Sequence, residues 1–244
     1  MELEHSVVYG PVKSRRFGWD LGINLLPLDH KLCCFDCVYC QYGFTPGMKN
    51  DRYNFSSVGE INRAWENQVK ICVARGIPIH HTTLSGNGEP TMHPRFADVV
   101  RGLTKWRDAN RPEIKLALLT TGYRCSDSEI REAMDLLDER IVKLDSAVPE
   151  KWRSINRPIL PLSFEEFKKS LCKITNLTLQ TMFIQNWNDS EEDIKAWKTA
   201  IAEIQPMAVQ IYTISRSPAL ANLKPVTQEF LQRLAEESLV IEAF

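Results

Sequence analysis

The sequence lacks the features that mark membrane, secreted and nucleic-acid-binding proteins. No apolar run approaches the roughly 18 residues of a membrane span, and the N-terminus lacks the basic-then-apolar pattern of a secretory signal. Neither sign of charge predominates, since the formal net charge is -1 at pH 7, so the basic surface typical of nucleic-acid binders is not predicted. We therefore expect a cytoplasmic protein with no membrane contact, whose charge gives no support to a nucleic-acid partner.

Low-complexity segments are also missing, so nothing divides the chain into separate domains. Hydrophobic residues make up 43% and charged residues 25% of the 244 residues, an ordinary balance for a globular protein, and one domain can reach this size. We predict a single domain with an N-terminal extension over residues 1–20, a core over 21–214, and a C-terminal segment with a helix over 215–244. The proline-containing stretch 157–161 is the one connection that we expect to be flexible.

Short apolar runs alternate with segments of helical periodicity along most of the chain. The apolar runs predict strands over residues 21–26, 80–84, 114–119, 140–144, 177–184 and 209–214. The periodic segments predict helices over residues 59–73, 96–106, 128–137, 163–174, 189–204 and 227–237. Ser163 and Glu166 have the spacing of a capping box at the start of one of these helices. Because parallel strands need crossover connections, usually helices, we predict an α/β fold whose parallel sheet is either open or closed into a partial barrel.

The cysteines do not have the pattern of a disulfide framework. The chain has seven, and in a reducing compartment clustered thiols indicate metal or redox chemistry. Four fall within eight positions, Cys33, Cys34, Cys37 and Cys40. They contain the spacing C-x3-C-x2-C, and three thiolates on such a loop can each bind a different iron of a cubane cluster, which leaves the fourth iron open. We expect the other cysteines to be small buried hydrophobic residues: Cys72, Cys125 and Cys172.

Two other interpretations of the clustered cysteines stay open on spacing alone. A zinc site needs a fourth ligand, which His30, His80 or His81 could provide, although the paired C-x2-C spacing of many zinc sites is missing. Chance clustering is the second alternative.

Polar and glycine-containing turns follow the predicted strands. The strand over 80–84 leads into Ser85-Gly86-Asn87-Gly88-Glu89-Pro90-Thr91, where the glycines permit close backbone approach and the carboxylate suits an ammonium group. Thr121 and Gly122 follow the next strand, and Asp145 follows the one after it. Each turn alone has an ordinary structural explanation. Ligand sites on parallel sheets form at the carboxyl ends of the strands, however, and these turns share that location.

Together these motifs resemble the radical S-adenosylmethionine (SAM) superfamily. In that family the three-cysteine loop follows the first strand of a (β/α)6 partial barrel, which is the fold that the resemblance implies here. The residue before the last cysteine, Tyr39 in this chain, is usually aromatic and lies near the adenine. The resemblance further implies a SAM site that includes the turn after the second strand, the turn after the third, the aspartate that ends the fourth, and a tyrosine of the last strand: Gly86, Asn87, Gly88, Glu89, Thr121, Asp145 and Tyr212.

A closer resemblance extends along nearly the whole chain. Residues 9–16, 21–27, 35–41, 155–158, 180–184 and 209–214 look like a group of largely uncharacterised iron-sulfur oxidoreductases related to wyosine-synthesising tRNA enzymes. One departure is Cys34, where that group commonly has asparagine. The resemblance implies a [4Fe-4S] cluster on Cys33, Cys37 and Cys40, SAM on the open iron, reductive cleavage to a 5'-deoxyadenosyl radical, and a reductant such as flavodoxin or ferredoxin.

The substrate is not named by the resemblance. A small molecule or a tRNA nucleotide is expected, and it would carry an anionic group if the basic side chains of Arg15, Arg16, Arg157 and Arg216 converge. Two other classes of function remain as alternatives: an activase that installs a radical on a partner protein, and a non-catalytic zinc or iron-sulfur binding module.

Overall fold

The computed structural model describes residues 2–14, 16–46, 53–237 and 241–243. In chain order the strands are β1 (Val8–Ser14), β2 (Gly18–Ile23), β3 (His81–Leu84), β4 (Lys115–Thr120), β5 (Glu139–Lys143), β6 (Leu177–Phe183), β7 (Ala208–Thr213) and β8 (Ile241–Ala243). The α-helices are α1 (Val58–Ala74), α2 (Phe96–Asn110), α3 (Ser128–Met134), α4 (Pro149–Asn156), α5 (Phe164–Leu171), α6 (Glu191–Ile204) and α7 (Gln228–Glu236). A short 3-10 helix, η1 (Pro90–Met92), follows β3.

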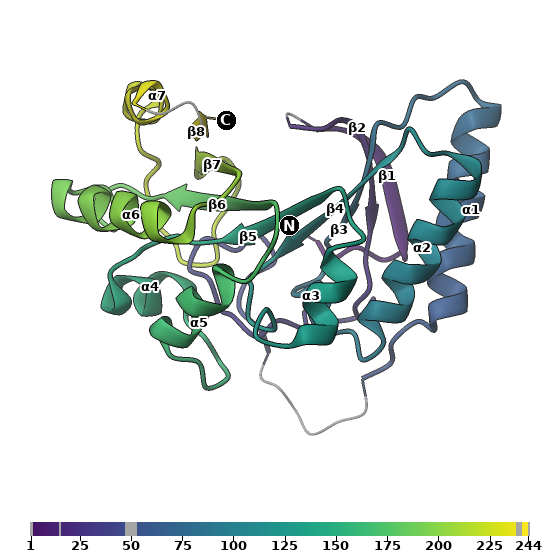
Figure 1. The fold of residues 1–244 in the computed structure, drawn as a ribbon, viewed down its shortest axis with the longest axis horizontal. Helices are drawn as coiled ribbons and strands as arrows, with labels where there is room; N and C mark the ends of the chain where they lie inside the picture. Colours follow the sequence, from purple (N-terminus) through teal and green to yellow (C-terminus); the bar gives the residue numbers. More distant parts are fainter. Residues whose placement is uncertain (1, 15, 47–52, 238–240, 244) are drawn as a thin grey trace.

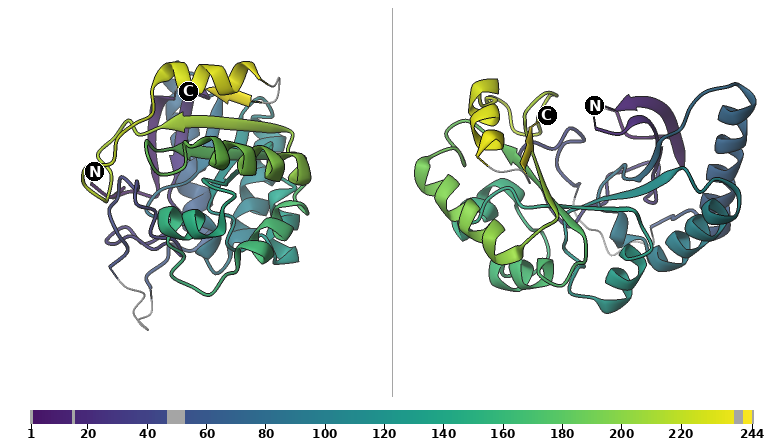
Figure 2. Two further views of the ribbon diagram at one scale, coloured as in Figure 1. Left: turned by 90° about the vertical axis from the view of Figure 1, so that its left-hand side faces the viewer. Right: turned by 45° about the horizontal axis from the view of Figure 1, so that its top comes forward.

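These strands form one curved sheet. Their order across the sheet is the chain order from β1 to β8; β1 is antiparallel to β2, and every later pair is parallel. Helices α1 to α6 cover the outer side of the sheet (Figure 1), and the concave side opens between the β1–β2 hairpin and β7–β8 (Figure 2). The predicted α/β fold with a (β/α)6 partial barrel is confirmed, with β2 to β7 as its six parallel strands.

The first strands differ from the sequence-based prediction. The apolar pattern predicts neither β1 nor β8, and the segment 1–20 contains β1 together with the start of β2. β2 begins at Gly18, three residues before the predicted start. The pattern does not reveal this start because Asp20 and Gly22, on the concave side, interrupt the apolar residues of the other side. It ends before residue 26 because the side chain of Asn24 bonds the backbone N–H and C=O of Leu26, both at 3.2 Å, and turns the chain.

Helix α4 is also absent from the prediction. It is short, and its apolar side consists mainly of Trp152 and Ile155, too little for a visible period. The capping box at α5 is confirmed, since Ser163 Oγ accepts from the Glu166 N–H at 3.1 Å and the Glu166 carboxylate accepts from the Ser163 N–H at 3.3 Å. Within the described ranges, no helix is long and apolar enough to cross a membrane.

The main core lies between the sheet and its helices. Trp65 of α1 and Trp197 of α6 are fully buried there, and each indole N–H donates to a threonine of the sheet, Thr82 at 3.0 Å and Thr181 at 2.9 Å. Such pairs fix the angle between helix and strand, because a buried indole N–H needs an acceptor. Among the scattered cysteines, Cys72 and Cys125 are buried as predicted, but Cys172 is exposed because it caps the end of α5.

The tip of the β1–β2 hairpin crosses the concave side of the sheet near the amino ends of the strands. Phe17 packs against Ala117 of β4 and Ile141 of β5, and its ring stacks on His81 with centroids 4.6 Å apart. Arg16 reaches β7, where its Nη1 donates to Gln210 Oε1 at 3.1 Å. The hairpin therefore covers the amino-terminal end of the barrel interior around Phe17 and His81, which we call the floor. It leaves the carboxyl ends of the strands, which we call the rim, to other residues.

Candidate cofactor site

The predicted cluster cysteines lie on the loop that follows β2. Cys33, Cys34 and Cys37 are buried, Cys40 is partly exposed, and all four are free thiols. The described part of the chain contains no group of three or more His, Cys, Asp or Glu side chains arranged around a single metal ion. A preformed mononuclear zinc site is thus not found there. A cubane cluster makes a different demand, because its three thiolates bind separate irons.

Backbone hydrogen bonds hold the cysteine loop from two sides. On one side the Leu32 N–H donates to Asn87 O at 2.8 Å, and the Glu89 N–H donates to Leu32 O at 3.0 Å. On the other side the Val38 N–H donates to Ile155 O at 2.9 Å, and the Ile159 N–H donates to Cys34 O at 2.8 Å. Since residues 158 and 159 pair with the loop, the expectation of a flexible connection over 157–161 is wrong there: its backbone groups have partners in the cysteine loop.

The Gly-Asn-Gly turn needs glycine at positions 86 and 88, because a side chain at either position would collide with neighbouring atoms. A Cβ on Gly88, where φ is +143°, would lie 1.8 Å from Leu32 O. A Cβ on Gly86, where φ is +127°, would lie 2.6 Å from Asn24 Oδ1. Only glycine combines this backbone conformation with such close approach. The turn is thereby pressed against the residue that precedes Cys33.

Asn87 has a structural role in this turn. Its Nδ2 donates to Glu4 O at 2.9 Å and to Pro27 O at 3.0 Å, and its Oδ1 accepts from the Glu4 N–H at 2.8 Å. The side chain therefore ties the N-terminal segment to the loop before the cysteines.

Glu89 is likewise engaged within the protein. It is completely buried, its Oε1 accepts from the hydroxyls of Thr91 and Thr120, both at 2.6 Å, and its Oε2 accepts from the Thr121 N–H at 2.6 Å. The carboxylate thus joins the turn after β3 to the end of β4.

Two thiols of the loop interact with each other and with the turn after β4. A hydrogen bond from the Cys34 thiol lowers the pKa of Cys33, while burial and the neighbouring Cys33 sulfur raise the pKa of Cys34 well above its usual value. Cys34 Sγ also lies 3.4 Å from Thr121 Oγ1. Cys34 is therefore a buried neighbour of the predicted ligands with a polar partner of its own.

Cys37 lies in surroundings that are unfavourable for a free thiolate. Burial, followed by the nearby Asp145 carboxylate, raises the pKa of Cys37 to about 12. A thiolate forms in such surroundings only if a positive partner compensates, and iron coordination supplies that charge. The donor set of Cys33, Cys37 and Cys40 thus fits an iron-sulfur cluster.

Asp145 is the centre of a second group of side chains at the same rim. It is 1% exposed; its Oδ1 accepts from the Met182 N–H at 2.8 Å, and its Oδ2 accepts from Asn156 Nδ2 at 2.6 Å and from the Tyr39 hydroxyl. Burial and the Asp145 charge raise the pKa of Tyr39 well above its usual value. Two predicted residues from different segments, Tyr39 and Asp145, are therefore in direct contact.

Lys143 completes this group and was not among the predicted residues. Its Nζ lies 3.8 Å from Asp145 Oδ1, 4.9 Å from the ring centroid of Tyr39 and 4.5 Å from that of Tyr212, and it donates to the Tyr212 hydroxyl. Burial opposes the charged form, but Asp145 and Tyr212 raise the pKa of Lys143 above its usual value. Strand alternation could have identified Lys143, since it shares a face with Asp145 two residues later.

Asn156 is the other residue that the sequence did not single out by itself. It is 1% exposed, and its Nδ2 lies 3.4 Å from Cys37 Sγ as well as 2.6 Å from Asp145. The only signal for it was its place within residues 155–158, one of the segments that resemble the iron-sulfur group.

The arginines whose convergence would favour an anionic substrate do not converge, as far as the three that the structure describes are concerned. Arg15 lies outside the described residues. Arg16 points toward the site, with its Cζ 5.9 Å from the Tyr212 ring centroid. Arg157 and Arg216 are exposed, and they contact the Phe44 ring, at 5.4 Å from its centroid, and the Gln41 side chain respectively. The cations beside Tyr212 are instead Arg16 and Lys143.

The candidate zinc-binding histidines also have partners elsewhere. His30 contacts Asp29 at 2.7 Å, His80 Nδ1 accepts from the Trp19 N–H at 3.2 Å, and His81 Nε2 contacts Glu139 at 3.0 Å.

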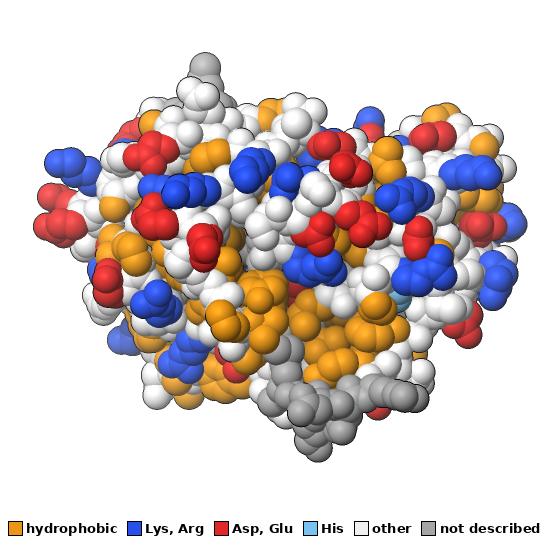
Figure 3. All heavy atoms as spheres, turned by 60° about the horizontal axis from the view of Figure 1, so that its bottom comes forward, with side chains coloured by type: hydrophobic (Ala, Val, Ile, Leu, Met, Phe, Trp, Pro, Cys, Tyr) orange, Lys and Arg blue, Asp and Glu red, His pale blue; other side chains and the backbone are white. Residues whose placement is uncertain are grey.

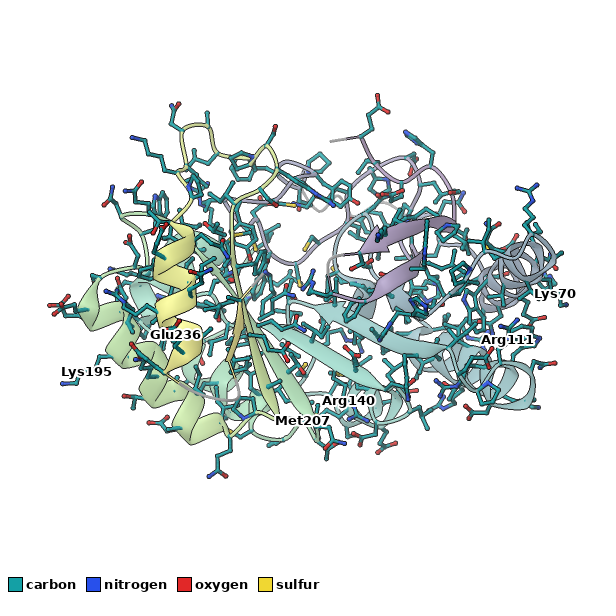
Figure 4. All side chains as sticks on the ribbon, turned by 90° about the horizontal axis from the view of Figure 1, so that it is seen from above. Lys70, Arg111, Arg140, Lys195, Met207 and Glu236 are labelled. Carbon is teal, nitrogen blue, oxygen red and sulfur yellow. The ribbon has the colours of Figure 1, made fainter. Side chains whose placement is uncertain are left out.

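Charges of both signs are mixed on the face shown in Figure 3. Basic and acidic side chains alternate there, and hydrophobic side chains gather beside the undescribed residues. Figure 4 looks onto the opening of the sheet. In it the labelled Lys70, Arg111 and Lys195 lie at the outer edge of the molecule and point away from the sheet. The mixed charge of these views agrees with the net charge of -1.

Comparison with known sequences finds relatives along nearly the whole chain. No protein-family model matches it. A UPF0026 protein from Synechocystis sp. is 31% identical over 232 residues, which cover 90% of this chain and 80% of that protein. A UPF0026 protein from Methanocaldococcus jannaschii is 28% identical, with 94% of this chain and 70% of that protein covered. A protein named GTPase Obg from Brachyspira hyodysenteriae is 26% identical, but the match covers 33% of it.

Comparison with solved structures identifies the fold. A radical SAM methyltransferase from Sphaerobacter thermophilus superposes with a TM-score of 0.69 at 13% identity, over 92% of this chain and 65% of that one. Streptococcus suis SuiB bound to S-adenosylmethionine gives 0.65 at 11% identity, over 91% and 50%. TYW1 with a lysine-pyruvate adduct bound gives 0.63 at 12% identity, over 89% and 72%. The fold is that of radical SAM enzymes, and the chain spans about two thirds of the methyltransferase and half of SuiB.

Proposed function

This chain belongs to the UPF0026 protein family, and we propose that it is a radical SAM enzyme whose Cys33, Cys37 and Cys40 hold a [4Fe-4S] cluster. The observation that carries the proposal is the meeting of three segments at the carboxyl ends of the strands. The cysteine loop is bonded to the turn over residues 86–89 on one side, and through Tyr39 it contacts Asp145 on the other. This is where parallel sheets bind ligands.

The chain's own residues divide the work of binding. Cys33, Cys37 and Cys40 would hold the cluster, and the chemistry that it would supply is one-electron reduction of SAM. With SAM bound, the backbone of residues 86–89 would receive the methionyl ammonium group, Asp145 would accept from the ribose hydroxyls, and Tyr39 would lie against the adenine. Thr121 borders the cysteine loop through Cys34. The floor formed by Phe17 and His81 closes the far end of the barrel, which keeps water from the reacting groups.

The substrate enters from the concave side and is a small molecule or a tRNA nucleotide. Arg16 and Lys143 flank the Tyr212 ring, but Lys143 already faces the Asp145 carboxylate at 3.8 Å, so these two cations give no separate support to an anionic substrate. The mixed surface charge in Figure 3 gives no added support to RNA. Electrons come from a cytoplasmic reductant such as flavodoxin or ferredoxin.

Anaerobic reconstitution tests the proposal. The protein should take up four irons and four sulfides, turn brown, and release 5'-deoxyadenosine from SAM after reduction with dithionite; methylthioadenosine should be sought as well. Serine substitution of Cys33, Cys37 or Cys40 should abolish the cluster absorbance, whereas Cys34→Ser should keep it. Binding of zinc without SAM cleavage would contradict the proposal.

A further inference from the structure

The side-chain amide of Asn156 bridges two parts of the candidate site that the sequence keeps far apart. Its single nitrogen lies 3.4 Å from Cys37 Sγ and 2.6 Å from Asp145 Oδ2. Both distances fit hydrogen bonds, because sulfur acceptors take longer ones than oxygen. The two N–H groups of one amide therefore point at a predicted cluster ligand and at a predicted ribose ligand.

The orientation of this amide follows from the charges around it. The reversed orientation would turn the amide oxygen toward a sulfur and a carboxylate, which are both acceptors when ionised. In the orientation described, Oδ1 is buried and has no hydrogen-bond partner among the described residues. The nitrogen of this amide therefore makes all the hydrogen bonds of the side chain that the described residues provide.

The position of Asn156 is held firmly by the backbone. It is the last residue of α4, and its carbonyl accepts from the Asp36 N–H at 3.1 Å, one residue before Cys37. The neighbouring Ile155 carbonyl accepts from the Val38 N–H at 2.9 Å. Backbone hydrogen bonds on both sides of Cys37 thus fix the distance between the amide and the thiol that it contacts.

We propose that Asn156 is a positioning residue that tunes the cluster and links it to SAM binding, an inference that rests on the proposed function. Its N–H donates to the Cys37 sulfur and so stabilises the extra electron of the reduced cluster, because hydrogen bonds to ligand sulfurs raise the reduction potential. Its other N–H orients Asp145, the predicted ribose ligand. Bound SAM and the cluster are thereby coupled through one side chain.

The test compares the cluster reduction potential of reconstituted full-length variants without SAM, by a redox titration followed by electron paramagnetic resonance. Asn156→Leu keeps the size of the side chain and removes both donors, so its potential should shift to a more negative value at unchanged iron content. Asn156→Gln retains the amide, so its reduction potential should lie between those of Asn156→Leu and the wild type. Asn188→Leu is the matched control, because Asn188 is equally buried and bonds the backbone of residues 145, 182 and 184; its potential should equal that of the wild type.

A potential of Asn156→Leu equal to the wild-type value would overturn the inference. If that variant takes up no cluster, wild-type protein carrying asparagine labelled with 15N in the side chain decides: a nitrogen coupling to the reduced cluster supports the hydrogen bond, and its absence overturns it. The SAM link has a separate readout, a several-fold weaker affinity of Asn156→Leu for SAM. A wild type that holds a cluster but does not cleave SAM contradicts the proposed function alone, since the potentials need no SAM.

Discussion

The two ends of the concave side of the sheet differ in how their polar groups are satisfied. At the amino end, Asp20 accepts from the Thr83 hydroxyl on both oxygens, at 3.0 and 2.9 Å, and His81 faces acceptors at both ring nitrogens. At the carboxyl end, Cys37 is buried with its pKa raised to about 12, and Asn156 Oδ1 has no partner in the described part of the chain. These floor groups thus have hydrogen-bond partners within the protein, whereas the rim includes a buried amide oxygen that has none among the described residues.

The rim depends most on the close approach at Gly88, so Gly88→Ala should have the largest effect. The added Cβ would lie 1.8 Å from Leu32 O, which should displace the cysteine loop, abolish cluster uptake and lower the free energy of unfolding by about 3 kcal/mol or more. Iron analysis and denaturant unfolding measure both effects.

The control for this variant is Gly76→Ala. Gly76 also has a positive φ, +67°, but nothing lies within 4 Å of the Cβ position, so only the backbone cost of about 1–2 kcal/mol is expected and iron uptake should be normal. Equal iron uptake by both variants would show that the rim does not need the close approach.

Asp20 on the floor should make the free energy of unfolding depend on pH. Burial raises the pKa of Asp20 to about 6, so the folded state binds this proton more tightly than the unfolded state does. The resulting stability is present below about pH 4 and is lost as the pH rises through 6. Asp20→Asn cannot ionise, so between pH 4 and 7 it should lose about 2–3 kcal/mol less than the wild type. Parallel unfolding curves at both pH values measure this; identical losses would contradict the ionisation of Asp20.

The same substitution at two buried carboxylates, Asp145 on the rim and Asp20 on the floor, tests which end of the barrel binds SAM. Asp145→Asn should raise the Kd for SAM about 10-fold, since a charge-assisted hydrogen bond is lost. Asp20→Asn, the same change at the amino end, should leave that Kd unchanged. Calorimetry on the reconstituted proteins makes the comparison, and equal effects would refute the division into a binding rim and a structural floor.

The smallest effect is expected for Glu139→Gln on the floor. Burial lowers the pKa of His81, but the contact with Glu139, with smaller effects of other neighbours, outweighs burial, so the pKa is raised overall. The stability that this contact contributes is therefore present below the usual His pKa and lost as the pH rises through the raised value. The variant should be destabilised by about 0.5–1 kcal/mol at pH 6 and by less at pH 8. A larger loss at pH 8 would mean that His81 is not the partner that titrates.

Local pattern was enough to predict the alternation of helices and strands, but not every element. The limits of β4 and β6 follow closely from the sequence, because β4 has four consecutive apolar residues and the fully buried β6 begins and ends with apolar residues. In contrast, β1 carries an exposed Val12 and pairs only with β2, and its edge position is a property of the whole sheet. Helix α4 is too short for a visible period.

The same division holds for the site. Spacing and resemblance were sufficient to propose Cys33, Cys37 and Cys40, and strand order was sufficient to expect Asp145 and the 86–89 turn at one edge, because the carboxyl ends of parallel strands meet there. The contact of Asn156 with Cys37 joins positions 119 residues apart, and the satisfaction of Glu89 by Thr120 and Thr121 joins two strand ends. Such contacts depend on how helices and loops pack, which is a long-range property that no local pattern encodes.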